Sequence, residues 1–183
     1  MGRVFVLFRH GPVCNPKDLV YGTLPGFPLE KGSGVLVRKS ASALESTLGR
    51  RPAGIVASPL LRSVQTAAQL AECFDCATYF DTRLAEVESV YQGSRRSEVL
   101  PLVRRGLSGD RESPEEVSAR MEVAVSEWLE RKDGVIVFVS HLLPIRLAVA
   151  GFGCQAADLS PCGYHVLAEA GVGTSTYRLV LSR

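Results

Sequence analysis

Short strand-like runs alternate with helix-like segments along almost the whole chain of 183 residues, and this alternation constrains the fold most strongly. Buried strands are predicted at 3–8, 53–57 and 134–139, because these runs are apolar and rich in β-branched or aromatic residues, and a weaker strand is predicted at 77–80. Helices are predicted in part of 29–48, from a Ser58 N-cap and Pro59 to about Cys73, near 96–105, from a capping box at Ser113 to about Arg131, and at about 142–151.

Two more strands are predicted at the end of the chain, at 164–169 and 175–181. The sequence Gly171-Val172-Gly173 between them is typical of an antiparallel hairpin. The order of all these elements predicts an α/β fold, in which a mixed, mainly parallel six-stranded sheet carries helices on both faces. At this length we expect one domain over residues 1–183.

The composition is that of an ordinary globular protein, with 46% hydrophobic and 22% charged residues. It excludes disorder, collagen and coiled coil for the whole chain, and a net charge of +2 does not favour a nucleic-acid partner. The apolar runs are much shorter than the ~20 residues of a membrane span. The start of the chain has no pattern of a signal peptide, so we expect a cytoplasmic protein whose five cysteines are reduced.

Chemically active residues follow three of the predicted strands. Arg9-His10-Gly11 follows the first strand, Arg62 lies just after the second, and His141 follows the strand at 134–139. In open α/β sheets, ligands bind outside the carboxyl ends of the strands. Two imidazoles, two guanidinium groups and two helix N-termini at that edge favour an anion, and phosphate matches the planar donor fork of arginine.

Each of these residues also has an ordinary structural explanation. Ser58 can be a simple helix cap, Arg62 a solvated charge, and a histidine at a strand end a packed structural residue. Their convergence on one edge of the sheet is what favours a site.

Other phosphate-binding patterns are missing from the sequence. It contains no Gly-Lys dipeptide and therefore no Walker A loop, and no cysteine is followed six positions later by an arginine. Cys73 and Cys76 form a Cys-x-x-Cys at the end of a predicted helix, where nothing lowers a thiol pKa. We therefore expect structural thiols there, and no zinc site that also recruits Cys154 and Cys162.

Several motifs together resemble the histidine phosphatase superfamily, also called the phosphoglycerate mutase-like family. They span most of the chain in the right order: Arg9-His10-Gly11, Ser58-Pro-Leu-Leu-Arg62-Ser-Val-Gln-Thr66-Ala, Leu84-Ala-Glu86 and Val139-Ser-His141. The resemblance implies a three-layer α/β/α sandwich of the phosphoglycerate mutase type. It also implies that the segment at about 81–113 is a short insert over the active site.

The resemblance further implies a role for each matching residue. His10 would be the nucleophile that forms a phosphohistidine, while Arg9, Arg62 and His141 would hold the phosphoryl oxygens. Glu86 would protonate the leaving oxygen and then activate water. No metal and no other cofactor is needed, because arginines and histidines supply the positive charge.

Some positions depart from the family pattern or leave an alternative open. Glu88 replaces Glu86 as the acid if the register differs by two residues. The family commonly has an acidic or amide residue where this chain has Pro12, and a glycine where it has Leu142. Leu142 can still offer its backbone N–H to the substrate, although it makes a bulkier pocket wall.

Further substrate contacts are expected from the loop after the first strand. Asn15 is a candidate phosphate ligand that lies one position earlier than in the mutases, and Tyr21 and Gly22 belong to a loop that resembles the family's pocket rim. An aromatic beside glycine and proline is equally typical of local packing. His165, the third histidine, is expected to be structural or exposed.

The preferred function is a phosphatase of small phosphomonoesters, whose partners are a phosphorylated metabolite or inorganic phosphate and which acts as a monomer or homodimer. The alternatives are a phosphoglycerate mutase-type transferase and a non-catalytic module that binds phosphorylated ligands. The short chain favours the phosphatase, although the insert contains five arginines that acidic substrates could use: Arg83, Arg95, Arg96, Arg104 and Arg105.

Overall fold

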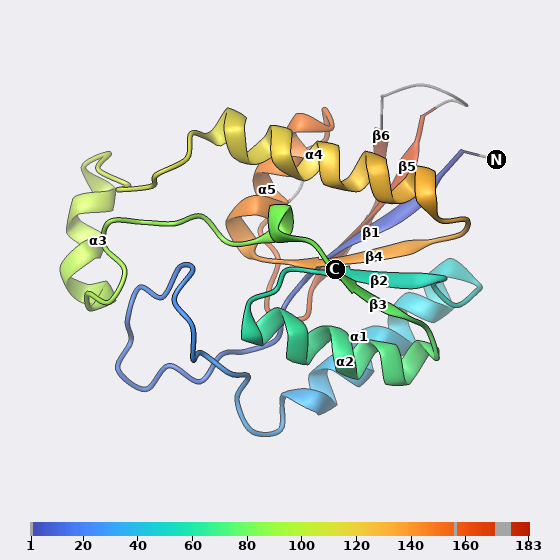
Figure 1. Cartoon of the computed structure of the whole chain (residues 1–183), viewed down its shortest axis with the longest axis horizontal. Coiled ribbons are helices and arrows are strands. Elements are labelled where there is room, and N and C mark those ends of the chain that lie inside the picture. The colour runs from blue at the N-terminus through green and yellow to red at the C-terminus, as the bar shows by residue number, and fades with distance from the viewer. Residues whose placement is uncertain (1, 156, 171–176) are drawn as a thin grey trace.

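A computed structural model describes residues 2–155, 157–170 and 177–183 of the chain. Its centre is a six-stranded sheet in the order β3-β2-β4-β1-β5-β6 (Figure 1). The strands are β1 (Val4–Arg9), β2 (Gly54–Ala57), β3 (Thr78–Phe80), β4 (Ile136–Ser140), β5 (Tyr164–Glu169) and β6 (Tyr177–Ser182).

The sheet is mixed, as the sequence predicts. Strands β3, β2, β4 and β1 run parallel, whereas β5 pairs antiparallel with β1 and β6 pairs antiparallel with β5. The antiparallel pairing of the last two strands is confirmed, and the predicted turn at Gly171-Val172-Gly173 lies outside the described residues. The predicted fold class is therefore correct.

Helices cover both faces of the sheet (Figure 1). One face is packed by α1 (Ser33–Leu48) and α2 (Leu61–Phe74), and the other by α4 (Pro114–Arg131) and α5 (Leu142–Gly151). Strand β1 is buried on both faces, because Phe5 and Leu7 point towards α4 and α5 while Val6 and Phe8 point towards α1 and α2. A strand buried in this way requires a continuous apolar run, which explains the composition of residues 4–8.

The capping box predicted at Ser113 is confirmed. Its hydroxyl accepts from the Glu116 N–H at 3.2 Å, and the Glu116 carboxylate accepts from the Ser113 N–H at 2.8 Å. These bonds satisfy two orphan donors at the start of α4 and fix its first turn.

The predicted N-cap at Ser58 is wrong. Helix α2 begins at Leu61, and Leu60 is its N-cap residue. The Ser58 hydroxyl accepts weakly from the Leu60 N–H at 3.3 Å but bonds to the His141 ring at 2.9 Å. The Ser58 hydroxyl, which the local pattern assigns to the start of the helix, therefore bonds mainly to His141, far away in the sequence.

The segment between β3 and α4 carries a short 3₁₀ helix, η1 (Thr82–Leu84), and α3 (Arg96–Arg104). It meets the long loop that follows β1, because Leu19 forms a β-bridge with Arg95 and the Val20 N–H donates to the Ser94 carbonyl at 2.9 Å. Both segments lie beyond the same edge of the sheet (Figure 1). Within the described ranges, no helix combines the length and the apolar character that a membrane crossing requires.

Candidate active site

The strand order brings the predicted site residues together. β1 and β2 both flank β4, so the segments that follow these three strands meet at one edge of the sheet. The His10 N–H donates to the Ser140 carbonyl at 3.1 Å, and the Ser58 N–H donates to the Val139 carbonyl at 2.9 Å. The rings of His10 and His141 consequently lie side by side, with their centroids 5.0 Å apart.

The His10 imidazole has a defined tautomer. Its Nδ1 bonds to the Gly11 carbonyl at 2.8 Å, and since a carbonyl only accepts, Nδ1 carries the hydrogen. Burial lowers the pKa of His10 to about 3, and the charges of Arg62 and Arg9 contribute to the same shift. The ring is therefore neutral at physiological pH, with a lone pair on Nε2.

His141 is wholly buried and held by two partners. The Arg62 Nε–H donates to its Nδ1 at 3.2 Å, so the hydrogen of a neutral ring is on Nε2, which donates to the Ser58 hydroxyl at 2.9 Å. The Ser63 hydroxyl lies 3.4 Å from the same Nε2. Burial lowers the pKa of His141 well below its ordinary value, and the nearby positive charges of Arg62 and Arg9 lower it further.

The Arg62 side chain is almost fully enclosed, with 1% of its surface exposed. Its Nη2 donates to the Gly22 carbonyl at 2.7 Å, and its guanidinium lies over the Tyr21 ring, 4.7 Å from the centroid. Burial lowers its pKa, but an arginine remains protonated at any physiological pH. The chain thus encloses a full positive charge in this pocket.

Arg9 adds a second charge. Its Nη1 donates to the Leu159 carbonyl at 2.5 Å, and its Nε is buried without a hydrogen-bond partner among the described residues. Across residues 2–155, 157–170 and 177–183, no carboxylate oxygen lies within 4.0 Å of the side-chain nitrogens of Arg9 or Arg62. Arg62 is buried and Arg9 is partly buried, so two positive charges without a paired carboxylate among these residues make an energetically costly site unless an anion occupies it.

Of the two candidate acids, the structure associates Glu86 with these arginines. Burial raises the pKa of Glu86 above its ordinary value, while the Val87 N–H at 3.0 Å and the positive charges of Arg62 and Arg9 partly oppose the rise. Glu88 is exposed and forms an ion pair with Arg111 at 3.0 Å. Only Glu86 therefore has the environment of a proton donor that works near neutral pH.

The three substrate contacts expected in the loop after β1 differ in their surroundings: Asn15 bonds within the loop, whereas Tyr21 and Gly22 contact Arg62. Both polar atoms of the Asn15 amide bond to the backbone of Leu19, at 2.9 and 3.0 Å, so this side chain closes a turn of the loop. Tyr21 stacks on Phe27 with ring centroids 5.0 Å apart and covers Arg62 with its face. Gly22 supplies the carbonyl that holds Arg62. Tyr21 and Gly22 lie against the buried charge, whereas the Asn15 amide is engaged elsewhere.

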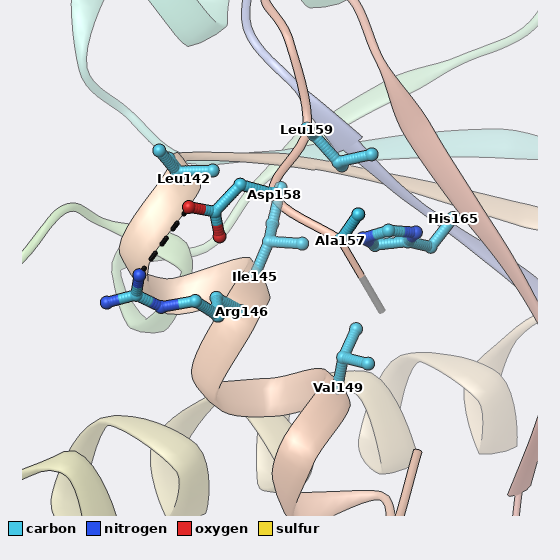
Figure 2. Close-up of a pocket in the computed structure, with 8 residues that line it drawn as sticks. All are labelled: Leu142, Ile145, Arg146, Val149, Ala157, Asp158, Leu159 and His165. Atoms are coloured by element: carbon cyan, nitrogen blue, oxygen red, sulfur yellow. Dashed lines mark ion pairs between the residues drawn. The ribbon is translucent and has the colours of Figure 1, made fainter. Parts of the chain in front are cut away.

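Leu142, the first residue of α5, borders a small cavity rather than a wide pocket. Figure 2 shows this cavity, which has a volume of about 10 Å³ and is also lined by Leu159 and His165. Arg146 and Asp158 form an ion pair across its mouth, with nitrogen and oxygen 3.6 Å apart. His165 is 1% exposed, so the expectation of an exposed residue is wrong and the structural alternative agrees with its burial.

The cysteines form no metal centre in the part of the chain that the structure describes. No group of three or more histidine, cysteine, aspartate or glutamate side chains there has the geometry to hold a metal ion. Cys73 and Cys76 are free thiols whose pKa is raised by partial burial. This direction agrees with the expectation that nothing activates them.

A comparison with known families places this geometry in context. Residues 5–168 match the histidine phosphatase superfamily (branch 1). The chain belongs to this superfamily. A relative at the sequence level is the uncharacterized protein Rv0525 of Mycobacterium tuberculosis, which is 32% identical over 157 residues, or 78% of this chain and 76% of that protein.

Solved phosphatase structures share the fold. The mycobacterial glucosyl-3-phosphoglycerate phosphatase Rv2419c has a TM-score of 0.82 and 23% identity, covering 99% of this chain and 98% of that one. The same enzyme with inorganic phosphate has a TM-score of 0.80 and 24% identity, covering 98% and 96%. A phosphoserine phosphatase of Entamoeba histolytica in complex with phosphoserine has a TM-score of 0.76 and 16% identity, covering 98% and 96%.

Two further side chains support the site, and the sequence assigns a role to neither of them. The Thr66 hydroxyl accepts from the Gly11 N–H at 3.1 Å and donates to the Arg62 carbonyl at 2.7 Å, which connects α2 to the loop that carries His10. Ser63 approaches the His141 ring. Both lie in the motif that contains Arg62, and their separation of three positions places them on one helix face.

Proposed function

We propose that this protein is a phosphatase that hydrolyses small phosphomonoesters through a phosphohistidine on His10. One observation carries the proposal: buried Arg62 and partly buried Arg9, neither of them paired with a carboxylate among the described residues, lie near a neutral imidazole whose Nε2 lone pair is unprotonated. A phosphoryl dianion would neutralise that charge and present its phosphorus to the lone pair.

Substrate binding would use the charges already in the pocket. Arg9 and Arg62 would donate to the phosphoryl oxygens, and His141 would add a ring N–H after leaving Ser58. The two guanidinium groups are in place before the substrate arrives, so they would stabilise the charge that builds on the equatorial oxygens in the transition state.

The first chemical step would transfer the phosphoryl group to the enzyme. Nε2 of His10 would attack phosphorus, the P–N bond would form and the bond to the ester oxygen would break. The proton on Nδ1 would remain bonded to the Gly11 carbonyl, which lets the ring carry the positive charge of the phosphohistidine.

Glu86 would act first as the general acid and then as the general base. Its raised pKa would keep a larger protonated fraction near neutral pH, so that it gives its proton to the leaving alkoxide. The carboxylate that remains would take a proton from water as the water attacks phosphorus. The P–N bond would break, and inorganic phosphate, neutral His10 and protonated Glu86 would result.

We propose that the reaction requires no metal ion. Arg9 and Arg62 supply two positive charges within the pocket, and this is the electrostatic contribution that a metal provides in other phosphoryl-transfer enzymes.

The surroundings of two of the five insert arginines favour the phosphatase over the mutase. Arg83 is bound by Asp81 at 2.7 Å and by Glu127 at 3.0 Å, and Arg96 pairs with Asp18 at 3.2 Å. Charges that are neutralised in this way would contribute little to the binding of a second acidic group on the substrate. We propose a single domain over 1–183, with the segment at about 81–113 at the rim of the site, acting as a monomer or homodimer.

The relatives support the proposed substrate class. Solved structures with the same fold include phosphatases named for glucosyl-3-phosphoglycerate and for phosphoserine, which are small phosphomonoesters. The third alternative, a module that only binds phosphorylated ligands, has no need for a buried acid with a raised pKa beside the arginines.

The proposal is tested by assaying an aryl phosphate and a panel of phosphorylated metabolites with excess chelator. We expect turnover by the wild type and none by His10→Ala. The control is His165→Gln, since His165 is also a buried histidine but lies in the separate cavity beside α5. Equal turnover by wild type and His10→Ala would exclude the nucleophile.

The same assay separates the alternatives. Interconversion of 2- and 3-phosphoglycerate faster than phosphate release would identify a mutase. Tight binding of phosphate with no turnover of any ester would identify a binding module. Turnover that the chelator abolishes would overturn metal independence.

A further inference from the structure

The backbone on the N-terminal side of Glu86 is held by hydrogen bonds from two side chains and by the burial of Leu84. The Arg120 Nη1–H donates to the Arg83 carbonyl at 2.5 Å, and the Ser140 hydroxyl donates to the Leu84 carbonyl at 2.7 Å. Leu84 is buried in the core beneath α4. Glu86 therefore lies only two residues after Leu84, where the backbone is fixed by hydrogen bonds from α4 and from β4.

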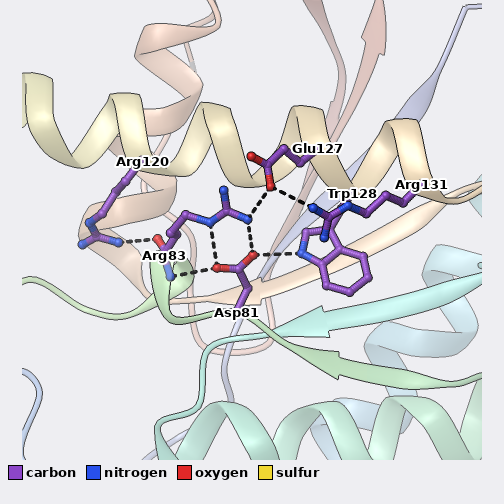
Figure 3. A network of polar contacts seen from close by, with 6 residues as sticks. All are labelled: Asp81, Arg83, Arg120, Glu127, Trp128 and Arg131. Carbon is purple, nitrogen blue, oxygen red and sulfur yellow. Dashed lines mark hydrogen bonds and ion pairs between the residues drawn. The ribbon is translucent and has the colours of Figure 1, made fainter.

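A polar network fixes the start of the same segment, as Figure 3 shows. Asp81 accepts two side-chain bonds from Arg83, at 2.9 and 2.7 Å, and one from the Trp128 Nε1–H at 2.9 Å. Arg83 also donates to Glu127 at 3.0 Å. Trp128 and Glu127 belong to α4, so the helix holds η1 through side chains as well as through the Arg83 carbonyl.

Arg120 also holds the other end of the segment. Its Nε and Nη2 form a two-pronged contact with the Glu112 carboxylate at 2.6 and 3.0 Å. The neighbouring Arg111 N–H donates to the Glu88 carbonyl at 2.9 Å, and Arg111 and Glu88 are ion-paired at 3.0 Å. The Arg120 guanidinium thus joins the Arg83 backbone, which precedes Glu86, to Glu112. The residue next to Glu112, Arg111, in turn bonds to the backbone of Glu88, which follows Glu86.

We propose that Arg120 is a positioning residue that holds Glu86 beside Arg9 and Arg62 in the catalytic pocket. This inference rests on the proposed role of Glu86 as the proton donor. Three of the five N–H groups of Arg120 are directed to two ends of the insert, and only a planar guanidinium can do this. A lysine at this position keeps the charge but loses the fork.

Arg120 also acts on Glu86 through its charge. It is one of the three positive charges that oppose the raised pKa of Glu86, after Arg62 and before Arg9. Loss of the charge raises the pKa of Glu86 further, because the carboxylate form loses a stabilising neighbour. Position and charge can therefore be separated experimentally, since Arg120→Lys removes only the fork and Arg120→Met removes both.

The test compares alkyl and aryl phosphates, since an alkoxide needs a proton to leave and an aryl oxide needs almost none. General acid catalysis contributes ~10²–10⁴-fold, so we expect both Arg120 variants to lose at least about 10-fold in kcat/KM on the alkyl ester. We expect less than about 3-fold loss in kcat/KM on the aryl ester, because kcat/KM reports the steps up to phosphoryl transfer and not the later attack of water, and this retained kcat/KM also shows that the variants are folded. Only Arg120→Met moves the basic limb of the pH profile to higher pH.

The control is Arg51→Met, because Arg51 forms an exposed ion pair with Glu45 at 3.0 Å and takes no part in the network around Asp81 and Arg83. It is expected to leave the ratio of alkyl to aryl rates unchanged. If the Arg120 variants also leave this ratio unchanged while Glu86→Gln lowers it, the positioning role is overturned and the proton donor stands. If Glu86→Gln leaves the ratio unchanged, the proposed acid and its positioning residue both fail.

Discussion

The hydroxyl of Thr66 offers a sharp test of how the catalytic loop is held. Thr66 is fully buried, and its Oγ1 accepts from the Gly11 N–H at 3.1 Å while the Gly11 carbonyl accepts from His10 Nδ1 at 2.8 Å. Thr66→Val keeps the side-chain shape and removes the acceptor. The Gly11 N–H then has no partner inside the protein, although the adjoining carbonyl still has to orient the nucleophile.

The magnitude follows mainly from the Gly11 N–H that loses its acceptor. An unsatisfied buried N–H costs about 1–3 kcal/mol. The Arg62 carbonyl also loses the Thr66 hydroxyl as a donor, but it lies in α2 at a position that receives the helical bond. For a domain of this size, ~1–3 kcal/mol lowers Tm by about 2–12 °C. A small displacement of the imidazole lowers kcat by about 10–100-fold.

The assay combines thermal unfolding, followed by the fluorescence of the single tryptophan, with turnover of an aryl phosphate. Thr66→Ser is the control, because it keeps the hydroxyl and loses only a methyl group, worth about 0.8 kcal/mol. We expect Thr66→Ser to keep most of the activity. A Thr66→Val protein with wild-type Tm and wild-type kcat would refute the role given to this hydrogen bond.

Three further predictions concern titration and reactivity. Because burial lowers the pKa of His10 to about 3, kcat/KM on an aryl phosphate is expected to show no acid limb near the ordinary value of 6.5; a limb there would contradict a neutral nucleophile. Asp81, bonded to Arg83, has a pKa of about 2 against an ordinary 3.8, so its stabilisation is complete above 3.8 and is lost as the pH falls through about 2. Urea unfolding across that range is therefore expected to be less pH-dependent in Asp81→Asn than in wild type, and equal slopes would contradict this. Exposed Cys14 is expected to react first with a thiol reagent and buried Cys162, whose pKa is raised to about 11, last; the reverse order would contradict the burial pattern.

Much of the fold can be predicted from the sequence because its elements follow local rules. The apolar run at 3–8 identifies β1, and the capping box at Ser113 marks the start of α4, since both signals depend on neighbouring residues. Ser58 is predicted wrongly because its hydroxyl bonds to His141, which is 83 positions away. Local chemistry permits either role, and only the order of the strands decides between them.

The site divides in the same way. Arg9, His10, Arg62 and His141 can be predicted to meet, because the carboxyl ends of neighbouring parallel strands meet at one edge. The choice of Glu86 over Glu88 depends on which carboxylate is less exposed and near the arginines, which a sequence does not specify.

Individual side-chain pairings are harder to predict from the sequence. Arg83 and Arg96 look like binding residues in the sequence, but in the structure Arg83 pairs with nearby Asp81 and with Glu127 of α4, and Arg96 pairs with Asp18. Arg120 looks like one more helix-surface arginine, yet it joins both ends of the insert.

The central claim is that His10 carries the phosphoryl group during turnover. The most direct measurement is rapid acid-free quenching of the enzyme with an aryl phosphate, followed by mass spectrometry of the peptide that contains residues 4–17. We expect the mass of one phosphoryl group on His10 in the wild type, accumulation of that species in Glu86→Gln as water activation slows, and none in His10→Ala. A phosphoryl group on another residue, or turnover without any phosphoenzyme in both wild type and Glu86→Gln, would contradict the mechanism.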